Sequence, residues 1–248
     1  IARRVPTSLF TFILPIVNRV FAPILAEVND NKTVLKRLYT KLAKLMSWVS
    51  FPMYLLLAAI SPTILTIVFG SEYIDGVFVM IIFSLKYAFS GVNTICGALQ
   101  VATGRTDIGL KWTIYSIIST LLVYGVSAQW GIGIFLISML ILIFFNLSIL
   151  WVIQFKPMVD ITWREYLSIF STSFIICLIL SVFIYLLYNH SSIVYAVCSS
   201  IVYLFLYLFI IINSKDGVTI LGLLNSINIP GVFKEGILKL KVITKSNN

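Results

Sequence analysis

Long apolar blocks separated by short polar connections dominate the chain. Seven blocks approach or exceed about 20 mainly apolar residues, the length that a helix needs to cross a bilayer. They cover Val5–Val28, Trp48–Phe69, Val77–Ala102, Trp112–Ala128, Ile132–Ile153, Leu167–Tyr188 and Ile193–Ile212. The blocks are continuous rather than alternating in polarity, which indicates helices and not the strands of a β-barrel. The pattern predicts an all-α integral membrane protein, with one bundle of about seven transmembrane helices (residues 1–212) and a cytoplasmic tail (213–248).

Composition supports this class of protein. Of the 248 residues, 60% are hydrophobic and 11% are charged, whereas a soluble domain is about half apolar and about a quarter charged. The first residue is Ile1, and no signal peptide precedes the first block. We therefore interpret the chain as the C-terminal part of a longer protein.

Charges in the connections predict the orientation. Connections rich in Lys and Arg alternate with connections that carry none, and the cation-rich ones belong on the cytoplasmic side. The cation-rich connections hold Lys32, Lys36, Arg37, Lys41 and Lys44, then Arg105 and Lys111, then Lys156 and Arg164, with five further lysines in the tail. A net charge of +9 could also suit nucleic acid, but the cations lie at the ends of apolar blocks. We therefore expect a multi-pass protein with a cytoplasmic C-terminus and no nucleic-acid partner.

The segment from Asp30 to Met46 is amphipathic. Its leucines and Tyr39 recur at helical spacing, and its cations fall largely on the other side. Such a helix is attracted to anionic lipid. We expect this segment to lie on the inner surface of the membrane, as a linker between the first two spans.

Two cations lie deep in predicted spans, Arg19 in the first and Lys86 in the third. Neither has an acidic residue at comparable depth, and an unpaired charge in lipid is costly. One interpretation is a cationic cavity for a phosphate-bearing substrate, with Arg19 as a bidentate donor and Lys86 as a point charge. The alternative is that both reach a polar edge or pair with an acid elsewhere.

Polar residues accompany these cations. Asn18 adjoins Arg19, while Asn93 and Gln100 lie seven and fourteen positions after Lys86, on about the same helix face. This alignment suggests a lined cavity, but hydrogen bonding between packed helices would give the same pattern. Other polar residues are interpreted differently: Asn146 and Gln154 as packing residues, and Trp112 as part of an aromatic belt at the membrane edge.

The sequence shows no set of residues typical of an enzyme active site. The loops expected to face outward hold Glu72, Asp75 and His190 on different connections, and no P-loop is present. The three cysteines are far apart in apolar blocks and suit packing rather than a disulfide or metal framework. We therefore expect no catalytic residues, no metal and no cofactor.

Several segments, in their order and spacing, resemble the C-terminal half of polysaccharide and O-antigen flippases, in the multidrug/oligosaccharidyl-lipid/polysaccharide exporter superfamily. They are APILAEVND, the basic segment, SFPMYLLLAAISPTILTIVFGSEY and, one span later, LQVATGR. The resemblance covers Ala2–Lys111. Its marks are Pro23, Pro52, Pro62, Phe69–Gly70 with Tyr73, and Gly104–Arg105. The remaining four spans fit the family only by number and length.

The resemblance implies half of a transporter with about fourteen helices in two bundles around a central cavity. Such proteins move an undecaprenyl-diphosphate-linked oligosaccharide from the inner to the outer leaflet of the bacterial inner membrane, for O-antigen, capsule or exopolysaccharide biosynthesis. The implied partners are this lipid-linked oligosaccharide diphosphate, the bilayer, and the polysaccharide polymerase and chain-length machinery. The resemblance implies a cationic cavity and alternating access by rocking of the two halves. It assigns no role to Arg19 or Lys86, and it makes Arg3 and Arg4 lesser cavity candidates.

Two other functions stay open at this point. A cation-coupled multidrug-type exporter of the same superfamily usually needs a deep acid, and this chain has none at mid-depth. A non-transporting membrane assembly partner is the second alternative, and for it Arg19 and Lys86 would be dispensable.

Overall fold

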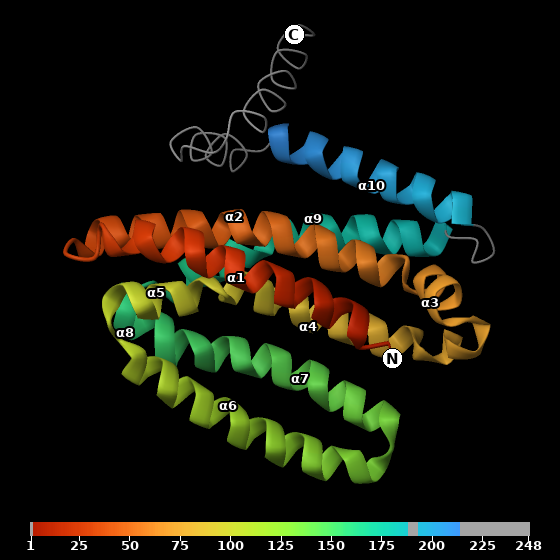
Figure 1. Ribbon diagram of the computed structural model, residues 1–248, viewed down its shortest axis with the longest axis horizontal. Coiled ribbons are helices and arrows are strands. Elements are labelled where there is room, and N and C mark those ends of the chain that lie inside the picture. The colour runs from red at the N-terminus through yellow and green to blue at the C-terminus, as the bar shows by residue number, and fades with distance from the viewer. Residues whose placement is uncertain (1, 188–192, 214–248) are drawn as a thin grey trace, which may run out of the picture.

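The protein is a bundle of long helices (Figure 1). The computed structural model describes residues 2–187 and 193–213, apart from the side chains of residues 13, 16, 18, 187, 193 and 195. The tail predicted over 213–248 lies outside the described residues, except for its first one. The elements are α1 (Arg4–Ala26), α2 (Lys32–Ala59), α3 (Ser61–Phe69), η1 (Ser71–Gly76), α4 (Val77–Asn93), α5 (Ile95–Thr103), α6 (Thr106–Ser127), η2 (Ala128–Trp130), α7 (Ile132–Leu150), η3 (Trp151–Phe155), α8 (Lys156–Val159), α9 (Trp163–Leu187) and α10 (Ile193–Asn213).

Six helical stretches in the described part of the chain are long and apolar enough to cross a membrane. They are Lys32–Ala59, Ser71–Thr103, Thr106–Trp130, Ile132–Val159, Trp163–Leu186 and Ala196–Asn213. The all-α membrane class is confirmed, and these stretches overlap the second to seventh predicted spans. The first predicted span is present as the helix α1, but three of its side chains are not described, so its membrane crossing stays a prediction.

Helix α2 forms the axis of the bundle, with α4 and α9 packed along it and α1 and α10 touching it less extensively. Phe51 of α2 is fully buried, and its ring centroid lies 5.1 Å from that of Phe89 on α4 and 5.4 Å from that of Phe174 on α9. The α2–α4 contact is closer still. Ser50 Oγ donates a hydrogen bond to the carbonyl oxygen of Ala88 (2.9 Å), and a Cβ added to Gly91 would overlap Ser50.

The prediction of a surface linker over Asp30–Met46 is wrong. This segment is the first half of α2, which runs without a break from Lys32 to Ala59, and its apolar face is buried in the protein at Leu35, Tyr39 and Leu42. The helical spacing was identified correctly, but protein contacts rather than lipid cover the apolar face. At about 1.5 Å per residue the 28-residue helix is about 42 Å long, more than the hydrocarbon core of about 30 Å, so its charged end can lie at the membrane edge.

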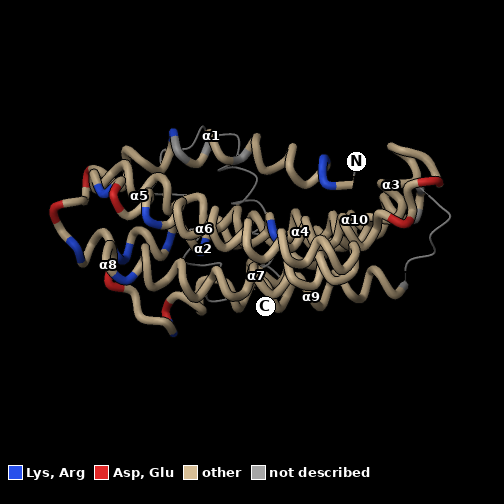
Figure 2. The backbone as a smooth tube through the Cα atoms, turned by 90° about the horizontal axis from the view of Figure 1, so that it is seen from below, with Lys and Arg blue, Asp and Glu red and all other residues tan. Residues whose placement is uncertain are grey.

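Charged residues gather at the two ends of the bundle (Figure 2). One end holds the start of α2, the α5–α6 turn and α8, and it carries most of the cations. The opposite end holds η1 with Glu72 and Asp75, together with the N-terminal arginines Arg3 and Arg4. The three cation-rich connections between described helices, which the sequence assigned to one side of the membrane, are therefore on one side of the fold.

Two of the spanning stretches are interrupted. The third predicted span was expected as one helix, but it consists of α4 and α5, which meet at Thr94, where the hydroxyl donates to the carbonyl oxygen of Gly91 (2.7 Å). The stretch that begins with α7 contains a π-helical turn, η3, over Trp151–Phe155. Back-bonding Thr hydroxyls bend helices, and π-turns are frequent at functional sites. Both interruptions border the cavity described next.

Candidate functional site: a polar cavity within the bundle

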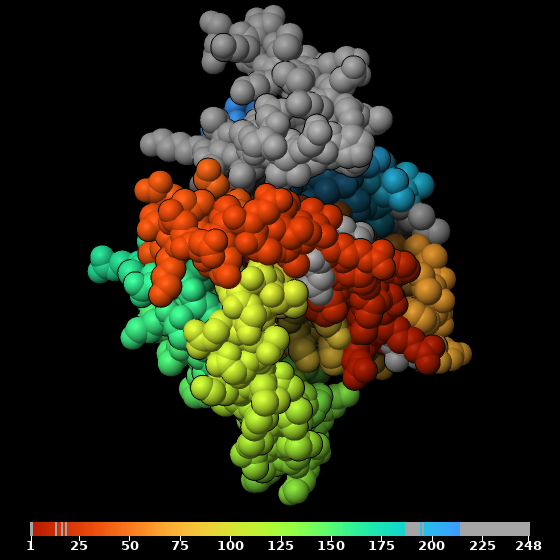
Figure 3. Space-filling view, turned by 60° about the vertical axis from the view of Figure 1, so that its left-hand side comes forward, coloured from red at the N-terminus to blue at the C-terminus, as the bar shows by residue number. Residues whose placement is uncertain are grey.

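A cavity of about 480 Å³ lies between α4–α5 on one side and α6–α7 on the other, with α1 and η3 at its margins. Its lining residues are Phe10, Leu14, Lys86, Phe89, Ser90, Asn93, Thr94, Cys96, Gly97, Gln100, Trp112, Ser116, Thr120, Tyr124, Met139, Leu142, Ile143, Asn146, Leu147, Leu150 and Gln154. Figure 3 shows a hollow between α1 and the yellow-green α5–α6 region, with α4 behind it. Its volume is within the range of small-molecule pockets, about 300–1,000 Å³.

One face of α4 and α5 supplies a polar stripe to this cavity. Lys86, Ser90, Asn93, Gly97 and Gln100 recur every three or four residues, and all of them line it. The sequence placed Lys86, Asn93 and Gln100 on one helix face, and the structure brings these three together despite the interruption at Thr94. Their role in binding a substrate stays a prediction.

Lys86 has aromatic rather than acidic neighbours. Its Nζ lies 5.8 Å from the ring centroid of Phe83, and the guanidinium carbon of Arg3 lies 5.8 Å from the same centroid. Ring faces attract cations at this range. No ion pair joins Lys86 to an acidic residue within the described part of the chain. A half-buried ammonium without a carboxylate can accept an anionic ligand.

Amides and a thiol form a row of hydrogen bonds in the part of the cavity nearest the cation-rich end of the bundle. Cys96 Sγ donates to Gln154 Oε1 (2.7 Å), and Gln100 Nε2 donates to Cys96 Sγ (3.8 Å). Gln154 belongs to the π-helical turn, so this row of hydrogen bonds joins the two interrupted stretches. Gly109 of α6 leaves room for Gln100, because a Cβ at that position would overlap the amide.

Two further amides line the cavity beside this row of hydrogen bonds. Tyr115 Oη donates to Asn146 Oδ1 (3.1 Å), and this bond joins α6 to α7. The bond uses the oxygen of Asn146 and not its NH₂ group. Asn93 Oδ1 is buried and has no hydrogen-bond partner in the structure. A buried polar atom costs free energy unless it is paired with protein, water or ligand. The cavity therefore offers the NH₂ group of Asn146 as a donor, whereas Asn93 Oδ1 is closed off from it.

Arg19 lies elsewhere. It is exposed and does not line the cavity, and it sits two positions from the buried Val17 and Phe21 of the same helix. Two positions correspond to about 200° around a helix, so Arg19 is on the side of α1 that faces away from the bundle. The structure does not bring Arg19 and Lys86 into one site. Any contribution of Arg19 to anion binding stays a prediction.

Arg3 and Arg4 are also separate from the cavity lining. Arg3 and Arg4 are exposed at the N-terminal end of α1, and only Arg3 comes near Lys86, through the shared Phe83 ring. The side chain of Asn18 lies outside the described residues. Metal ligands were not expected, and within the described residues no group of three His, Cys, Asp or Glu side chains is placed to hold an ion.

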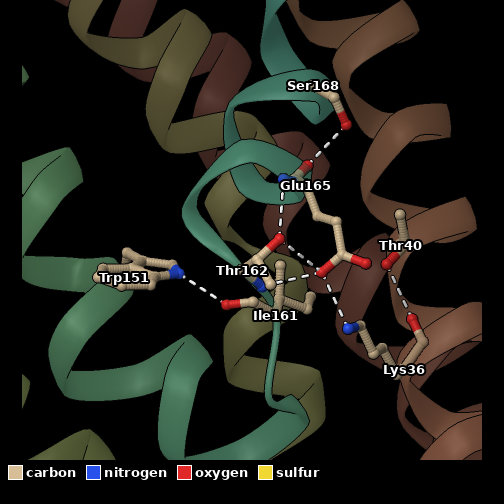
Figure 4. Close-up of polar contacts among 7 residues, drawn as sticks. All are labelled: Lys36, Thr40, Trp151, Ile161, Thr162, Glu165 and Ser168. Atoms are coloured by element: carbon tan, nitrogen blue, oxygen red, sulfur yellow. Dashed lines mark hydrogen bonds and ion pairs between the residues drawn. The ribbon is translucent and has the colours of Figure 1, made fainter.

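A polar cluster joins α2 to α9 at the cation-rich end of the bundle (Figure 4). Glu165 Oε2 forms an ion pair with Lys36 Nζ (2.9 Å) and accepts a hydrogen bond from the Thr162 backbone N–H (2.8 Å). In return, the Glu165 N–H donates to Thr162 Oγ1 (3.3 Å), which is the reciprocal pattern of a capping box. Trp151 Nε1 donates to the carbonyl oxygen of Ile161 (2.8 Å). These bonds fix α2, α9 and the π-helical turn relative to one another.

The structure adds lining residues that the sequence reasoning missed. Ser116, Thr120 and Tyr124 line the cavity from α6 at a spacing of four, a signal that was available in the sequence. Trp112 also faces the cavity, although the sequence assigned it to an aromatic belt. Asn146 was assigned to packing, and it both joins two helices and lines the cavity.

Comparison with known proteins finds similar proteins of polysaccharide biosynthesis. The model of a family described as polysaccharide biosynthesis proteins matches residues 1–78. The lipopolysaccharide biosynthesis protein WzxC of Escherichia coli (strain K12) is 25% identical over 155 residues, which are 62% of this chain and 31% of that protein. The teichuronic acid biosynthesis protein TuaB of Bacillus subtilis (strain 168) is 28% identical over 113 residues, 46% of this chain and 23% of that protein.

The chain is similar to this polysaccharide biosynthesis family over residues 1–78. The resemblance identified in the sequence is thereby confirmed. The chain spans about a quarter to a third of the length of these two curated relatives. An uncharacterized membrane protein in the cps region of Klebsiella pneumoniae is similar as well, at 27% identity over 119 residues, 48% of this chain and 24% of that protein. No solved structure matches the chain.

Proposed function

We propose that this chain forms one bundle of a flippase that moves an undecaprenyl-diphosphate-linked oligosaccharide across the bacterial inner membrane. The observation that carries the proposal is the cavity, in which the unpaired Lys86 and a polar stripe face a hollow of about 480 Å³ inside an apolar bundle. The names of the relatives, which refer to lipopolysaccharide and teichuronic acid biosynthesis, support a substrate on the route to surface polysaccharide.

The physical task of such a protein is to desolvate a charged headgroup. Burying a diphosphate without compensation costs many kcal/mol, and a fixed cation offsets part of that cost. Lys86 is half-buried and has no acidic partner among the described residues, so its charge is available to a phosphate. The lipid tail would stay in the bilayer while the headgroup passes through the hydrated cavity.

Orientation and assembly follow from the same proposal. The cation-rich end of the bundle (Figure 2) would face the cytoplasm, and the C-terminus with it. A second bundle would complete the transport path, with alternating access through rocking of the two bundles. The polysaccharide polymerase and chain-length machinery would act on the product at the outer leaflet.

The deciding experiment is complementation. The full-length gene with Lys86→Ala would be expressed in a strain lacking its own flippase, and surface polysaccharide would be quantified. We expect transport to fall about 10- to 100-fold, since a charge-assisted hydrogen bond contributes about 1.5–3 kcal/mol. Lys86→Arg should retain part of the activity because it keeps the charge.

Matched controls make this result specific. Lys111→Ala removes an exposed lysine at the start of α6 and should have no effect, provided that both variants reach the membrane at equal levels. Arg19→Ala tests separately the cation on the side of α1 that faces away from the bundle. Normal surface polysaccharide with Lys86 and Arg19 altered together would refute the proposal and favour a non-transporting assembly role. If the unaltered gene raises drug resistance in this strain but does not restore surface polysaccharide, an exporter of the multidrug type is favoured.

A further inference from the structure

We propose that a latch between α10 and α2 holds the last described helix against the axis of the bundle. In this latch the hydroxyl of Tyr207 on α10 replaces the backbone donor that Pro52 removes from α2. Its parts are the Tyr207 hydroxyl, the carbonyl group of Trp48 and Pro52, and together they are called the α2–α10 latch below. The latch is a conformational device that needs no substrate, so it goes beyond the proposed function.

Pro52 leaves a gap in the hydrogen bonding of α2. It lies inside this helix, four residues after Trp48. In an α-helix the N–H of residue 52 would donate to the carbonyl oxygen of residue 48, but proline has no N–H and its ring clashes with that carbonyl group. A buried carbonyl costs free energy unless it finds another donor. Trp48 is buried, so the replacement has to come from the protein.

Tyr207 supplies that donor from the far end of the described chain. Its Oη donates to the carbonyl oxygen of Trp48 at 2.6 Å, across 159 positions of the sequence. The tyrosine is buried, and its ring lies beside the indole of Trp48, with centroids 5.9 Å apart. The bond is therefore short, buried and directed at the carbonyl that lacks its usual helical donor. Membrane helices tolerate proline where a neighbour pairs with the freed carbonyl in this way.

Helix α10 contacts the bundle along one narrow face. It lies on the outside, against α9 and α2 (Figure 1). The buried side chains in its described part are Ala196, Tyr203 and Tyr207, at spacings of seven and four, while large apolar residues such as Ile201 and Phe205 are exposed. Lipid is as apolar as these side chains, so apolar contact contributes less to helix association than in water, and a hydrogen bond between helices contributes relatively more.

The latch lies next to the packed centre of the bundle. Phe51, the neighbour of Pro52, contacts the ring of Phe89, and Phe89 lines the cavity. Prolines inside helices are sites of bending. A change in the bend of α2 at Pro52 would move Phe51 relative to the cavity wall. The α2–α10 latch thus links the position of α10 to that wall.

Tyr203, one helical turn before Tyr207, provides the contrast. It is fully buried, and its ring stacks on that of Tyr207 with centroids 6.4 Å apart, but its hydroxyl has no hydrogen-bond partner among the described residues. The two tyrosines share a helix, a buried position and ring packing, and the Tyr207 hydroxyl alone meets the freed carbonyl. An effect of ring packing would be common to both, whereas an effect of the latch belongs to Tyr207.

The first test is a double-mutant cycle on the full-length protein, measured by thermal unfolding in detergent. Tyr207→Phe keeps the ring and removes the hydroxyl, and Pro52→Ala returns an N–H to α2. We expect Tyr207→Phe to lower the Tm by about 2–4 °C when Pro52 is present, and by less than about half of that in the Pro52→Ala background, where the carbonyl of Trp48 has its helical donor again. Tyr203→Phe is the matched control and should not lower the Tm in either background.

The second test measures the position of α10 directly and does not require Pro52→Ala to fold. Spin labels would be attached to Val34→Cys on α2 and Leu208→Cys on α10, both exposed positions, with the exposed Cys198 replaced by serine. The distance between the labels would be measured by pulsed electron paramagnetic resonance, with the full-length protein in lipid nanodiscs. We expect Tyr207→Phe to broaden the distance distribution.

Each result decides for or against the latch. An equal loss of Tm from Tyr207→Phe in both proline backgrounds would overturn it, because the hydroxyl would then act elsewhere. A distance distribution that Tyr207→Phe leaves unchanged, or that Tyr203→Phe broadens to the same extent, would also overturn it. Neither measurement depends on transport, so failure of the latch is distinguishable from failure of the proposed function.

Discussion

Helices α2 and α6 are both long and apolar, yet the protein surrounds them very differently. We compare the most apolar 18-residue stretch of each helix. In α2, 72% of that stretch is buried inside the protein, whereas in α6 only 6% is. α2 contacts α4, α9, α10 and α1, whereas α6 chiefly contacts α7, with which it forms a hairpin at one side of the bundle (Figure 1). Behind that hairpin lies the cavity.

The comparison separates two uses of a membrane helix. A helix satisfies its own backbone hydrogen bonds, so α6 can keep its shape with little protein around it. Its outer face carries large apolar residues that suit lipid, such as Ile117, Leu121 and Leu122, while Ser116 and Thr120 face inward. α2, in contrast, depends on close side-chain packing. We infer that α2, α4 and α9 form the rigid part of the bundle and that the α6–α7 hairpin is a less closely packed wall of the site.

The largest difference should appear when an aromatic ring is removed from each region. Phe51→Ala empties the centre of the α2–α4–α9 contact, whereas Phe145→Ala removes a ring on α7 that is 58% exposed. In soluble cores such a truncation costs about 3–5 kcal/mol. Lipid is as apolar as the core, so only the packing part remains, about 2–3 kcal/mol.

Thermal unfolding in detergent would measure this pair. Phe145→Ala should stay within about 0.5 kcal/mol of wild type, as substitutions away from packed features do. Equal losses for the two variants would mean that α7 is packed as tightly as α2, which would remove the distinction between the rigid part and the less closely packed wall.

A smaller effect is expected from adding a methyl group to a glycine. Gly91→Ala places a Cβ against Ser50 at the α2–α4 contact, whereas the Cβ in Gly125→Ala, on α6, meets nothing within 4 Å. Overpacking costs about 1–3 kcal/mol, and the better helix propensity of Ala returns about 0.5–1 kcal/mol. The net change should be about 1–2 kcal/mol of destabilisation at Gly91 and a slight stabilisation at Gly125.

Denaturation curves and folded yield would be compared for the two alanine variants. A second variant, Ser50→Ala in the Gly91→Ala background, should recover part of the loss, because it removes the hydroxyl that the new Cβ meets. If Ser50→Ala gives no recovery, the α2–α4 contact is not the source of the cost.

The smallest effect concerns the edge of the rigid part. Lys36→Met removes the ion pair with Glu165 that joins α2 to α9 (Figure 4). Exposed pairs contribute about 0.2–1 kcal/mol, and Glu165 keeps its bonds to Thr162, so stability should fall by less than about 1 kcal/mol. The loss should shrink at high salt, which screens exposed charges. A larger, salt-independent loss would show that Lys36 acts through packing.

The site itself was predictable in part. The spacing of Lys86, Asn93 and Gln100 is a property of one helix, and it survived the break at Thr94 because both flanking segments stay helical. The contribution of Gln154 was not predictable, since it depends on a π-helical turn meeting Cys96, 58 positions away in the sequence. Arg19 looked equivalent to Lys86 along the chain, but α1 packs through Val17 and Phe21, which turns Arg19 outward.

The sequence by itself determined the membrane class, the approximate positions of most apolar helices and the side of the fold on which the cations of the described connections gather. These are local properties, set by the length of each apolar block, by helical periodicity and by the charges at block ends. Only the tertiary structure decided that the basic segment continues into α2, and which helix faces enclose a cavity rather than a packed core. Those outcomes depend on the shapes of side chains from distant segments, and a face that is apolar or polar along one helix does not say what will cover it.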